Sequence, residues 1–331
     1  PAFRFMIKIR INANFHTIGG KSVLRSKDPR FLEYRERWAS RPQSFAAGEF
    51  PLHLDIEASS NCNLRCPFCA TNYRSIGNKG FMSFNTFKKV IDEGAKQGLC
   101  AIKLNSGNRG EPLLNRLLPE MIAYAKKKGI MDVYFNTNAT LLTKDTSKKV
   151  IKAGLDRLSI SFEGTTPEVY EKYRVGAKFN KVLKNIKDFI KIRNKIKMGK
   201  PLVRIQTVAV PEVAAALAEY KRFWSKIADE VIYFDFKDHA KQRDLVCDWT
   251  CPSFWQRLSI AWDGSITACH EYPDFCKLGN INRGNSVRSV WQGRALEKLR
   301  ELQKKGRSHE IEMCNNCAFR AAEIFKLKKG K

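Results

Sequence analysis

The feature that most constrains this chain is a group of three cysteines, Cys62, Cys66 and Cys69, at C-x3-C-x2-C spacing. They directly follow an alternating segment, 52–58, that predicts a β-strand. Thiolates are soft ligands that suit iron–sulfur clusters or zinc. A structural zinc site needs a fourth ligand close by, and the nearest following thiol is the distant Cys100. The spacing therefore favours a cluster held at three corners, with its fourth iron left for a small molecule.

This stretch, with Phe68 before the third cysteine, resembles the C-x3-C-x-aromatic-C signature of the radical S-adenosylmethionine (SAM) superfamily. The resemblance implies a 4Fe–4S cluster on Cys62, Cys66 and Cys69, whose open iron binds SAM. It also implies that an electron from a donor such as flavodoxin or ferredoxin splits SAM into methionine and a 5′-deoxyadenosyl radical. That radical abstracts a hydrogen from the substrate. A zinc loop is the alternative.

Residues 52–236 are predicted to alternate between strands and helices, which is typical of a parallel sheet with right-handed crossovers. Strands are expected near 52–58, 101–105, 131–136, 157–162, 202–209 and 230–236. Helices are expected near 84–97, 115–128, 145–153, 178–195 and 213–227. These six units resemble the partial (β/α)6 TIM-type barrel of radical SAM enzymes, an α/β fold. Chemistry in such barrels lies at the C-terminal ends of the strands.

Several segments after these strands resemble SAM-binding motifs of the family. Gly110-Glu111 matches part of a Gly-Gly-Glu-Pro motif in which Arg109 replaces the first glycine, and Glu163 stands where aspartate is common. The resemblance assigns contacts with SAM or substrate to these residues: Gly110, Glu111, Asn136, Asn138, Ser161, Arg174 and Gln206. Ordinary turns, or a surface ion pair for Arg174, are the alternatives.

The end of the sixth predicted strand carries three candidates for a proton acceptor. Asp235, Lys237 and His239 follow one another at alternate positions. A radical oxidation of an alcohol needs a base, so these residues are the predicted catalytic or substrate-contacting groups. Ordinary loop residues are the alternative.

A second group of cysteines lies after residue 245. Cys251, Cys269 and the pair Cys314 and Cys317 flank a predicted hairpin turn at 262–265. The pattern resembles the SPASM/twitch extension of radical SAM enzymes in its one-cluster form. This resemblance implies a second, auxiliary 4Fe–4S cluster on these four thiolates. Either Cys247 or Cys276 can replace one of them, and a zinc site on the same four thiolates is a further alternative.

The chain is expected to divide into an N-terminal extension (1–50), the partial barrel (51–240) and a small C-terminal α+β cluster-binding extension (241–331). In the N-terminal part we expect a strand near 5–11, a loop at Gly19-Gly20 and a helix from Asp28-Pro29. The Asp-Pro pair is a typical helix start. This helix is expected to cap the bottom of the barrel or to form one wall of the substrate pocket.

The composition excludes some classes of protein and leaves others open. Ten cysteines in a chain with no predicted membrane span or signal peptide indicate metal or redox work in a cytoplasmic protein. A formal charge of +27 is compatible with an RNA, an anionic membrane or a phosphorylated substrate. The lysines are spread along the predicted helices without interleaved aromatic residues, which disfavours nucleic acid.

The resemblance implies a SAM-dependent oxidoreductase. Similar one-cluster enzymes oxidise a hydroxyl of an aminocyclitol to a ketone, with the auxiliary cluster as electron acceptor. A small sugar or cyclitol alcohol is therefore the expected substrate. The alternatives are a peptide-modifying maturase, an RNA-modifying enzyme and a non-catalytic iron–sulfur protein.

Overall fold

The computed structural model describes residues 15–22, 24–69, 71, 77–106, 109–196, 199–236, 249–271 and 276–329, with only the backbone of 15 and 325–329. The strand expected near 5–11 lies outside these residues. Among the described helices, none is long and apolar enough to cross a membrane.

Six parallel strands form the centre of the structure, in the order in which they occur in the chain. They are β2 (His53–Ile56), β3 (Ala101–Lys103), β4 (Asp132–Thr137), β5 (Arg157–Ser161), β6 (Leu202–Val208) and β7 (Glu230–Phe234). The described sheet has two free edges, so the barrel is partial, and the predicted α/β class is confirmed.

Four more strands extend this sheet at its two ends. On one side, β1 (Phe15–Gly20) pairs antiparallel with β7. On the other, β8 (Arg257–Ile260) pairs parallel with β2. The strands β9 (Ser265–Thr267) and β10 (Lys277–Asn280) then continue the sheet antiparallel. The C-terminal part of the chain is therefore hydrogen-bonded directly to the strand that precedes the three-cysteine loop.

The expectation that Gly19 and Gly20 lie in a loop is wrong, because both belong to β1. The exposed edge of β7 supplies hydrogen-bonding partners, and this pairing outweighs the low strand propensity of glycine. Gly20 has φ of +74°, and a Cβ there would lie 2.1 Å from the Asp229 carbonyl oxygen. Glycine thus permits the close approach at the end of this strand.

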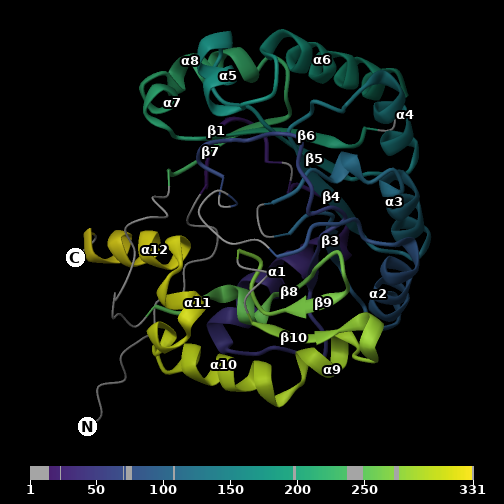
Figure 1. The fold of residues 1–331 in the computed structure, drawn as a ribbon, viewed down its shortest axis with the longest axis vertical. Coiled ribbons are helices and arrows are strands. Elements are labelled where there is room, and N and C mark those ends of the chain that lie inside the picture. Colours follow the sequence, from purple (N-terminus) through teal and green to yellow (C-terminus); the bar gives the residue numbers. More distant parts are fainter. Residues whose placement is uncertain are drawn as a thin grey trace.

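Helices cover the outer face of the sheet, as Figure 1 shows along its right and upper sides. They are α2 (Phe84–Lys96), α3 (Leu118–Lys127), α4 (Lys144–Lys152), α5 (Pro167–Tyr173), α6 (Phe179–Ile196), α7 (Pro211–Ala215) and α8 (Leu217–Trp224). The α6 helix buries the predicted apolar stripe that includes Phe179, Val182 and Ile186. One helix expected at 213–227 is divided into α7 and α8, and α5 was not expected.

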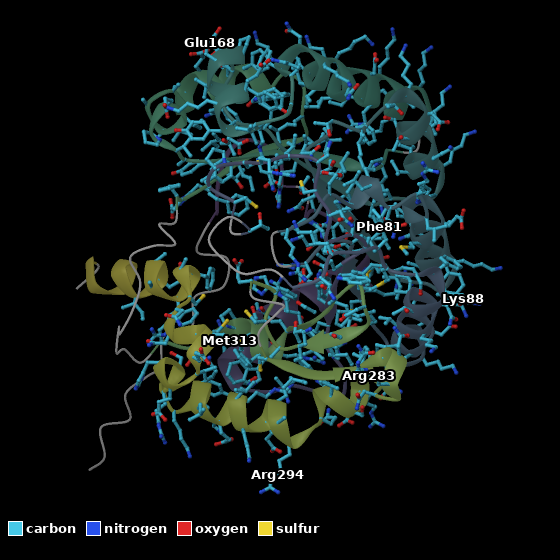
Figure 2. The ribbon with its side chains drawn as sticks, in the orientation of Figure 1. Phe81, Lys88, Glu168, Arg283, Arg294 and Met313 are labelled. Carbon is cyan, nitrogen blue, oxygen red and sulfur yellow. The ribbon has the colours of Figure 1, made fainter. Side chains whose placement is uncertain are left out.

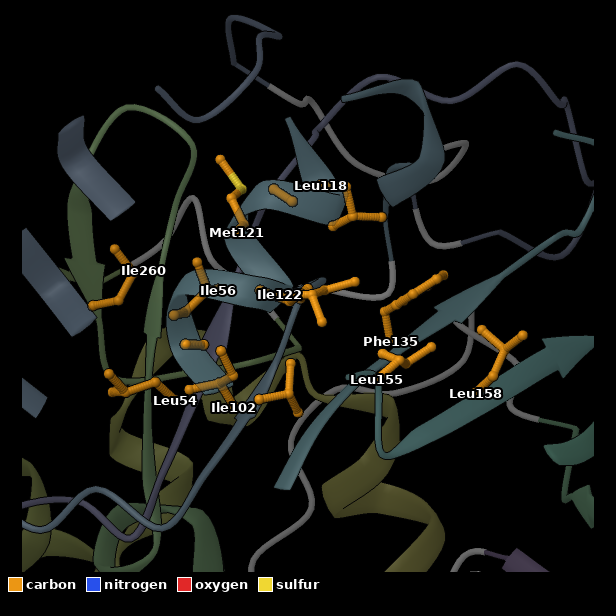
Figure 3. Packing of buried hydrophobic residues seen from close by; sticks show 14 of the residues in the cluster. Leu54, Ile56, Ile102, Leu118, Met121, Ile122, Phe135, Leu155, Leu158 and Ile260 are labelled. Carbon is orange, nitrogen blue, oxygen red and sulfur yellow. The ribbon is translucent and has the colours of Figure 1, made fainter. Parts of the chain in front are cut away.

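The main core lies between the sheet and these helices (Figure 3). Alternate residues of each strand point to this core, as Leu54 and Ile56 do in β2. Met121 and Ile122 of α3 pack against them from the helix side. Long charged side chains such as Lys88 and Glu168 point away from the sheet (Figure 2).

The opposite face of the strands carries buried ion pairs. Three pairs join neighbouring strands: Arg157 Nε to Asp132 Oδ1 (2.8 Å), Arg204 Nε to Glu230 Oε2 (2.8 Å) and Arg257 Nη1 to Asp55 Oδ2 (3.2 Å). The two-residue period of a strand places these residues on the same face as the residues that line the cavity described below. The inner face of the sheet is therefore filled in part by buried side chains whose charges are paired.

The helix α1 (Pro29–Ser44) begins after Asp28, whose side chain accepts from the Arg30 amide at 3.0 Å. It buries Phe31, Tyr34 and Trp38 in a small cluster with Leu52 and Cys100. Leu52 directly precedes β2 and Cys100 directly precedes β3, so α1 covers the N-terminal ends of these strands. The expected cap on the bottom of the barrel is confirmed, and Cys100 is a buried residue of this cluster.

The C-terminal extension contains the predicted hairpin, formed by β8 and β9. Short helices follow: α9 (Val287–Trp291), α10 (Arg294–Lys304), α11 (Glu312–Asn315) and α12 (Ala318–Lys329). The described structure also contains the 3-10 turns η2 (Pro112–Leu114), η3 (Pro252–Trp255), η4 (Ile281–Arg283) and η5 (Ser308–Glu310). In the view of Figure 1, α9 and α10 lie below the sheet, and α11 and α12 lie on its left side.

Candidate active site

A cavity of about 460 Å³ lies at the C-terminal ends of the parallel strands, a volume typical of small-molecule sites. The three loop cysteines, all seven residues assigned to SAM or substrate contact, and Asp235 line it. The structure thus brings together residues predicted from widely separated segments. Lys237 and His239 lie outside the described residues.

The loop after β2 carries the three cysteines, called here the loop site: Cys62, Cys66 and Cys69. Each of their sulfurs has a polar hydrogen beside it. The distances are 3.6 Å from Arg174 Nη1 to Cys66 Sγ, 3.1 Å from Thr71 Oγ1 to Cys69 Sγ and 4.0 Å from Asn138 Nδ2 to Cys62 Sγ. Hydrogen bonds to sulfur help to set the potential of a cluster. The donor set therefore fits a cluster on three thiolates that opens into the cavity.

Two thiols of the loop site hold their protons more tightly than ordinary cysteines do when no metal is bound. Burial raises the pKa of Cys66 to about 11, although the positive charge of Arg174 opposes this shift. Burial also raises the pKa of Cys62. Metal binding must therefore displace these protons.

Gly110 occupies a position that only glycine fits. Its φ is +75°, and a Cβ there would lie 1.9 Å from the Ser59 carbonyl oxygen. The next amide, Glu111 N, donates to Asn61 O at 2.7 Å. The segment after β3 therefore packs directly against the start of the cysteine loop.

The Glu111 carboxylate joins two strand ends. It accepts from Leu113 N at 3.1 Å, from Thr137 Oγ1 at 2.8 Å and from Asn138 N at 2.8 Å. Burial raises its pKa to about 7, against the opposing effect of these hydrogen bonds. The carboxylate therefore shapes the cavity wall, and its contact with the SAM amino group stays a prediction.

A polar wall continues along the next strands. Gln206 Nε2 of β6 donates to Ser161 Oγ of β5 at 3.1 Å. Asn136 N of β4 donates to Asn105 Oδ1 at 3.1 Å, which leaves the Asn136 side chain at the cavity. These groups offer neutral hydrogen-bonding partners to a bound molecule.

Arg174 forms a two-pronged ion pair with the fully buried Glu163. Its Nη2 lies 2.8 Å from Glu163 Oε1, and its Nε also donates to this carboxylate. The guanidinium lies 5.4 Å from the centroid of the Phe68 ring. Arg174 thus connects the segment after β5 to the loop site, and its predicted pairing with the SAM carboxylate stays a prediction.

Asp235 follows β7 and lies beside His16 of β1, with 3.1 Å between Asp235 Oδ1 and His16 Nε2. The His16 ring stacks on Tyr233 with centroids 4.5 Å apart. Sequence reasoning missed His16, because nothing in the sequence links the N-terminal strand to the edge of β7. The pair offers a carboxylate at the cavity with an imidazole behind it.

The four cysteines of the extension, called here the extension site, are Cys251, Cys269, Cys314 and Cys317. The pKa of Cys314 is raised well above its ordinary value, first by burial and then by its neighbours Cys269, Cys317 and Cys251. All four thiols therefore lie near one another. Among the described residues, no three His, Cys, Asp or Glu side chains converge tightly enough to hold a single metal ion.

Gln303 of α10 connects two cysteines of the extension site. Its Oε1 accepts from Cys251 N at 2.9 Å, and its Nε2 donates to Cys314 Sγ at 3.4 Å. Sequence reasoning missed this fully buried glutamine, because a single amide in a helix carries no signal. Burial raises the pKa of Cys276, and its alternative role as a ligand stays a prediction, while Cys247 lies outside the described residues.

Two contacts connect the extension to the cavity. Glu271, two residues after Cys269, lines the same cavity as the loop site. Arg109 also lines it and pairs with the buried Glu57, with 3.1 Å between Arg109 Nη2 and Glu57 Oε2. The Trp262 amide of the hairpin donates to the same Glu57 carboxylate at 3.2 Å. The hairpin, Glu57 and Arg109 thus form one continuous wall.

Solved structures of proteins with bound AdoMet have the same fold as this chain. A crystal structure of BtrN in complex with AdoMet and 2-DOIA is 16% identical, covers 80% of this chain and 92% of its own, and has a TM-score of 0.54. Native anSMEcpe with bound AdoMet and Cp18Cys peptide is 17% identical, covers 80% and 87%, and has a TM-score of 0.59. At these identities the similarity establishes the fold.

Comparisons of sequence agree with this fold. A probable GTP 3′,8-cyclase of Methanococcus maripaludis is 33% identical over 137 residues, which is 41% of this chain and 45% of that relative. The model of the radical SAM superfamily matches residues 56–219, and that of the SPASM iron–sulfur cluster-binding domain matches residues 251–318. The chain therefore belongs to the radical SAM superfamily and is a SAM-dependent enzyme with a C-terminal SPASM-type domain.

Proposed function

We propose that this enzyme oxidises a hydroxyl of a sugar or cyclitol to a ketone by two electrons. One observation carries the proposal: a single cavity is lined both by the loop site and by Glu271, two residues after Cys269. A substrate in this cavity would contact the loop site and the segment that follows Cys269. The resemblance to one-cluster alcohol-oxidising enzymes and the BtrN structure with AdoMet and 2-DOIA support the choice of substrate.

The loop site would hold the SAM-binding 4Fe–4S cluster and the extension site one auxiliary 4Fe–4S cluster. When bound, these groups and SAM supply a 5′-deoxyadenosyl radical that takes the carbinol hydrogen atom and an acceptor for the remaining electron. The proton of the hydroxyl then goes to a base. Asp235 is the described candidate, because its carboxylate lines the cavity and His16 orients it. Ser161 and Gln206 would position the substrate or SAM.

Peptide modification is a second candidate, favoured by apolar side chains at the cavity. Phe68 and Phe236 line the cavity, and Phe236 is 51% exposed. Exposed apolar groups at a site suit the side chains of a peptide. The anSMEcpe structure with Cp18Cys peptide shares this fold.

The test is the fate of a carbinol deuterium. The reconstituted enzyme is supplied with SAM, a reductant and a panel of sugars and cyclitols deuterated at their carbinol carbons. The proposal predicts deuterium in 5′-deoxyadenosine and one ketone per deuterium transferred. Asp235→Asn should lower ketone formation by about 100-fold, as the loss of a general base does. Deuterium transfer with a redox-neutral product, or transfer from a peptide alone, would contradict the proposal.

A further inference from the structure

Most charged groups that line the cavity have a partner of opposite charge or a dipole beside them. Arg174 pairs with Glu163, and Arg109 pairs with Glu57. Asp235 lies against His16, and the Glu271 carboxylate lies 3.4 Å from His270. The Glu111 carboxylate accepts three hydrogen bonds. Each of these charged groups therefore has a polar partner of its own in the described structure.

Two of the cationic side chains that line the cavity, Arg65 and Lys79, differ from the others in their partners. Arg65 and Lys79 line the cavity and are exposed. Arg65 Nη1 donates to the Leu64 carbonyl at 3.3 Å. In the described structure neither side chain forms an ion pair with a carboxylate. Arg65 and Lys79 are therefore the cavity-lining cations of the described structure that have no carboxylate partner.

The backbones that carry these two cations are held in place. Arg65 N donates to Val175 O at 3.0 Å. Beside Lys79, Gly80 N donates to Ser60 Oγ at 2.8 Å, and the Trp262 ring packs so closely on Gly80 that a Cβ there would lie 2.4 Å from it. The structure thus presents both charges from fixed backbone segments, Arg65 within the cysteine loop and Lys79 after it.

The cofactors do not cancel these charges. An oxidised 4Fe–4S cluster with three thiolates carries one negative charge, and SAM carries one net positive charge. The two together are neutral. Arg65 and Lys79 therefore remain available to an anion that binds beside them.

We propose that Arg65 and Lys79 bind an anionic group of the substrate, a phosphate or a carboxylate. The inference rests on the proposed function and narrows its substrate to a phosphorylated or acidic sugar or cyclitol. Charge-assisted hydrogen bonds from Arg and Lys suit phosphate and carboxylate oxygens. The carboxylate of SAM is the other source of the same chemistry, and the test below separates the two.

The test measures binding to the anaerobically reconstituted enzyme by calorimetry, without a reductant. The probes are inorganic phosphate, added to the SAM-saturated enzyme, and SAM alone. The variants are Arg65→Gln with Lys79→Gln and, as a control of equal charge change, Lys88→Gln with Lys89→Gln on the outer face of α2. We expect the first pair to weaken phosphate binding about tenfold, while the affinity for SAM and all affinities of the control stay unchanged.

Three outcomes would overturn the inference. The first is that phosphate does not bind the wild-type enzyme, and the second is that it binds both double variants with equal affinity. The third is that Arg65→Gln with Lys79→Gln weakens SAM binding about tenfold, which would assign the cations to the SAM carboxylate. Because no turnover is involved, the outcome is independent of deuterium transfer. Failure of the oxidation and failure of the anion site are therefore distinguishable.

Discussion

The loop site and the extension site hold cysteines in opposite ways. The loop site draws three from one short segment after β2, and Cys62 is exposed. The extension site draws four from segments before η3, after β9 and around α11, and Cys314 is buried. Three thiolates at an open cavity leave one iron for SAM, whereas four thiolates from separate segments complete a cluster. The difference separates a site that binds a small molecule from one that suits electron transfer.

The residues that support the two sites differ in charge. Glu111, a carboxylate, joins the strand ends beside the loop site through three hydrogen bonds. Gln303, a neutral amide, joins Cys251 and Cys314. A carboxylate suits a site that receives an ammonium group, and an amide avoids a further negative charge among four thiolates.

The largest expected effect separates the two sites by activity. Cys66→Ser removes a ligand of the loop site. It should therefore lower 5′-deoxyadenosine formation by more than about 100-fold, the typical effect of losing a residue that only hydrogen-bonds to a metal ligand. Cys314→Ser should preserve SAM cleavage while net substrate oxidation is lost. Cys100→Ser, in the cluster under α1, is the control and should change neither. Equal loss of SAM cleavage in both variants would remove the distinction between the sites.

A pH dependence should distinguish Glu111 from Gln303 in the metal-free protein. The pKa of Glu111 is about 7 in the folded protein, whereas its ordinary value is 4.5. The folded state therefore binds the carboxyl proton more tightly than the unfolded state does. Its contribution to stability is present below pH 4.5 and is lost as the pH rises through 7, by roughly 3 kcal/mol. Glu111→Gln should flatten the free energy of unfolding over this range, measured with denaturant. An unchanged slope would contradict the assigned role of burial.

The clusters should stabilise the protein unequally. A cluster on the extension site closes a long loop, from Cys251 to Cys317, whereas one on the loop site closes only the segment from Cys62 to Cys69. The loop-closure entropy differs by about 2 kcal/mol. Replacing the four extension cysteines by alanine should therefore lower the thermal midpoint more than replacing the three loop cysteines. A larger loss from the loop variant would reverse the comparison.

The smallest expected effect concerns the backbone at the loop site. Gly110 and Gly98 have nearly equal φ, +75° and +74°, but only Gly110 faces a backbone atom, the Ser59 carbonyl oxygen. Gly98→Ala should cost about 1 kcal/mol through its backbone conformation alone. Gly110→Ala should cost at least about 1 kcal/mol more because the added methyl group collides. Chemical denaturation measures both, and equal losses would show that the close approach is unimportant.

The loop site and its surroundings are predictable from the sequence for a physical reason. The cysteine spacing, Gly110 and the strand-end residues each depend on a short segment, and parallel strands bring their C-terminal ends together. The stretch from β2 to α6 follows the predicted alternation for the same reason, since periodicity and caps such as Ser83 are local. The seven residues assigned to SAM or substrate contact accordingly line one cavity.

The features that were missed depend on contacts between distant segments. The pairing of β1 with β7, the addition of β8 to β2 and the position of Gln303 between Cys251 and Cys314 require the folded sheet. The pair of Arg109 with Glu57 is of the same kind. Burial and nearby partners, rather than local propensity, decide these positions.

The most direct test of two separate clusters is the iron and sulfide content after anaerobic reconstitution. We compare the native chain with the variant in which Cys62, Cys66 and Cys69 are all replaced by alanine. The account predicts about eight irons in the native chain and about four in the variant, one 4Fe–4S cluster on each set of cysteines. About four irons falling to none, with zinc in the extension site, would contradict it, because the enzyme would then lack its internal electron acceptor.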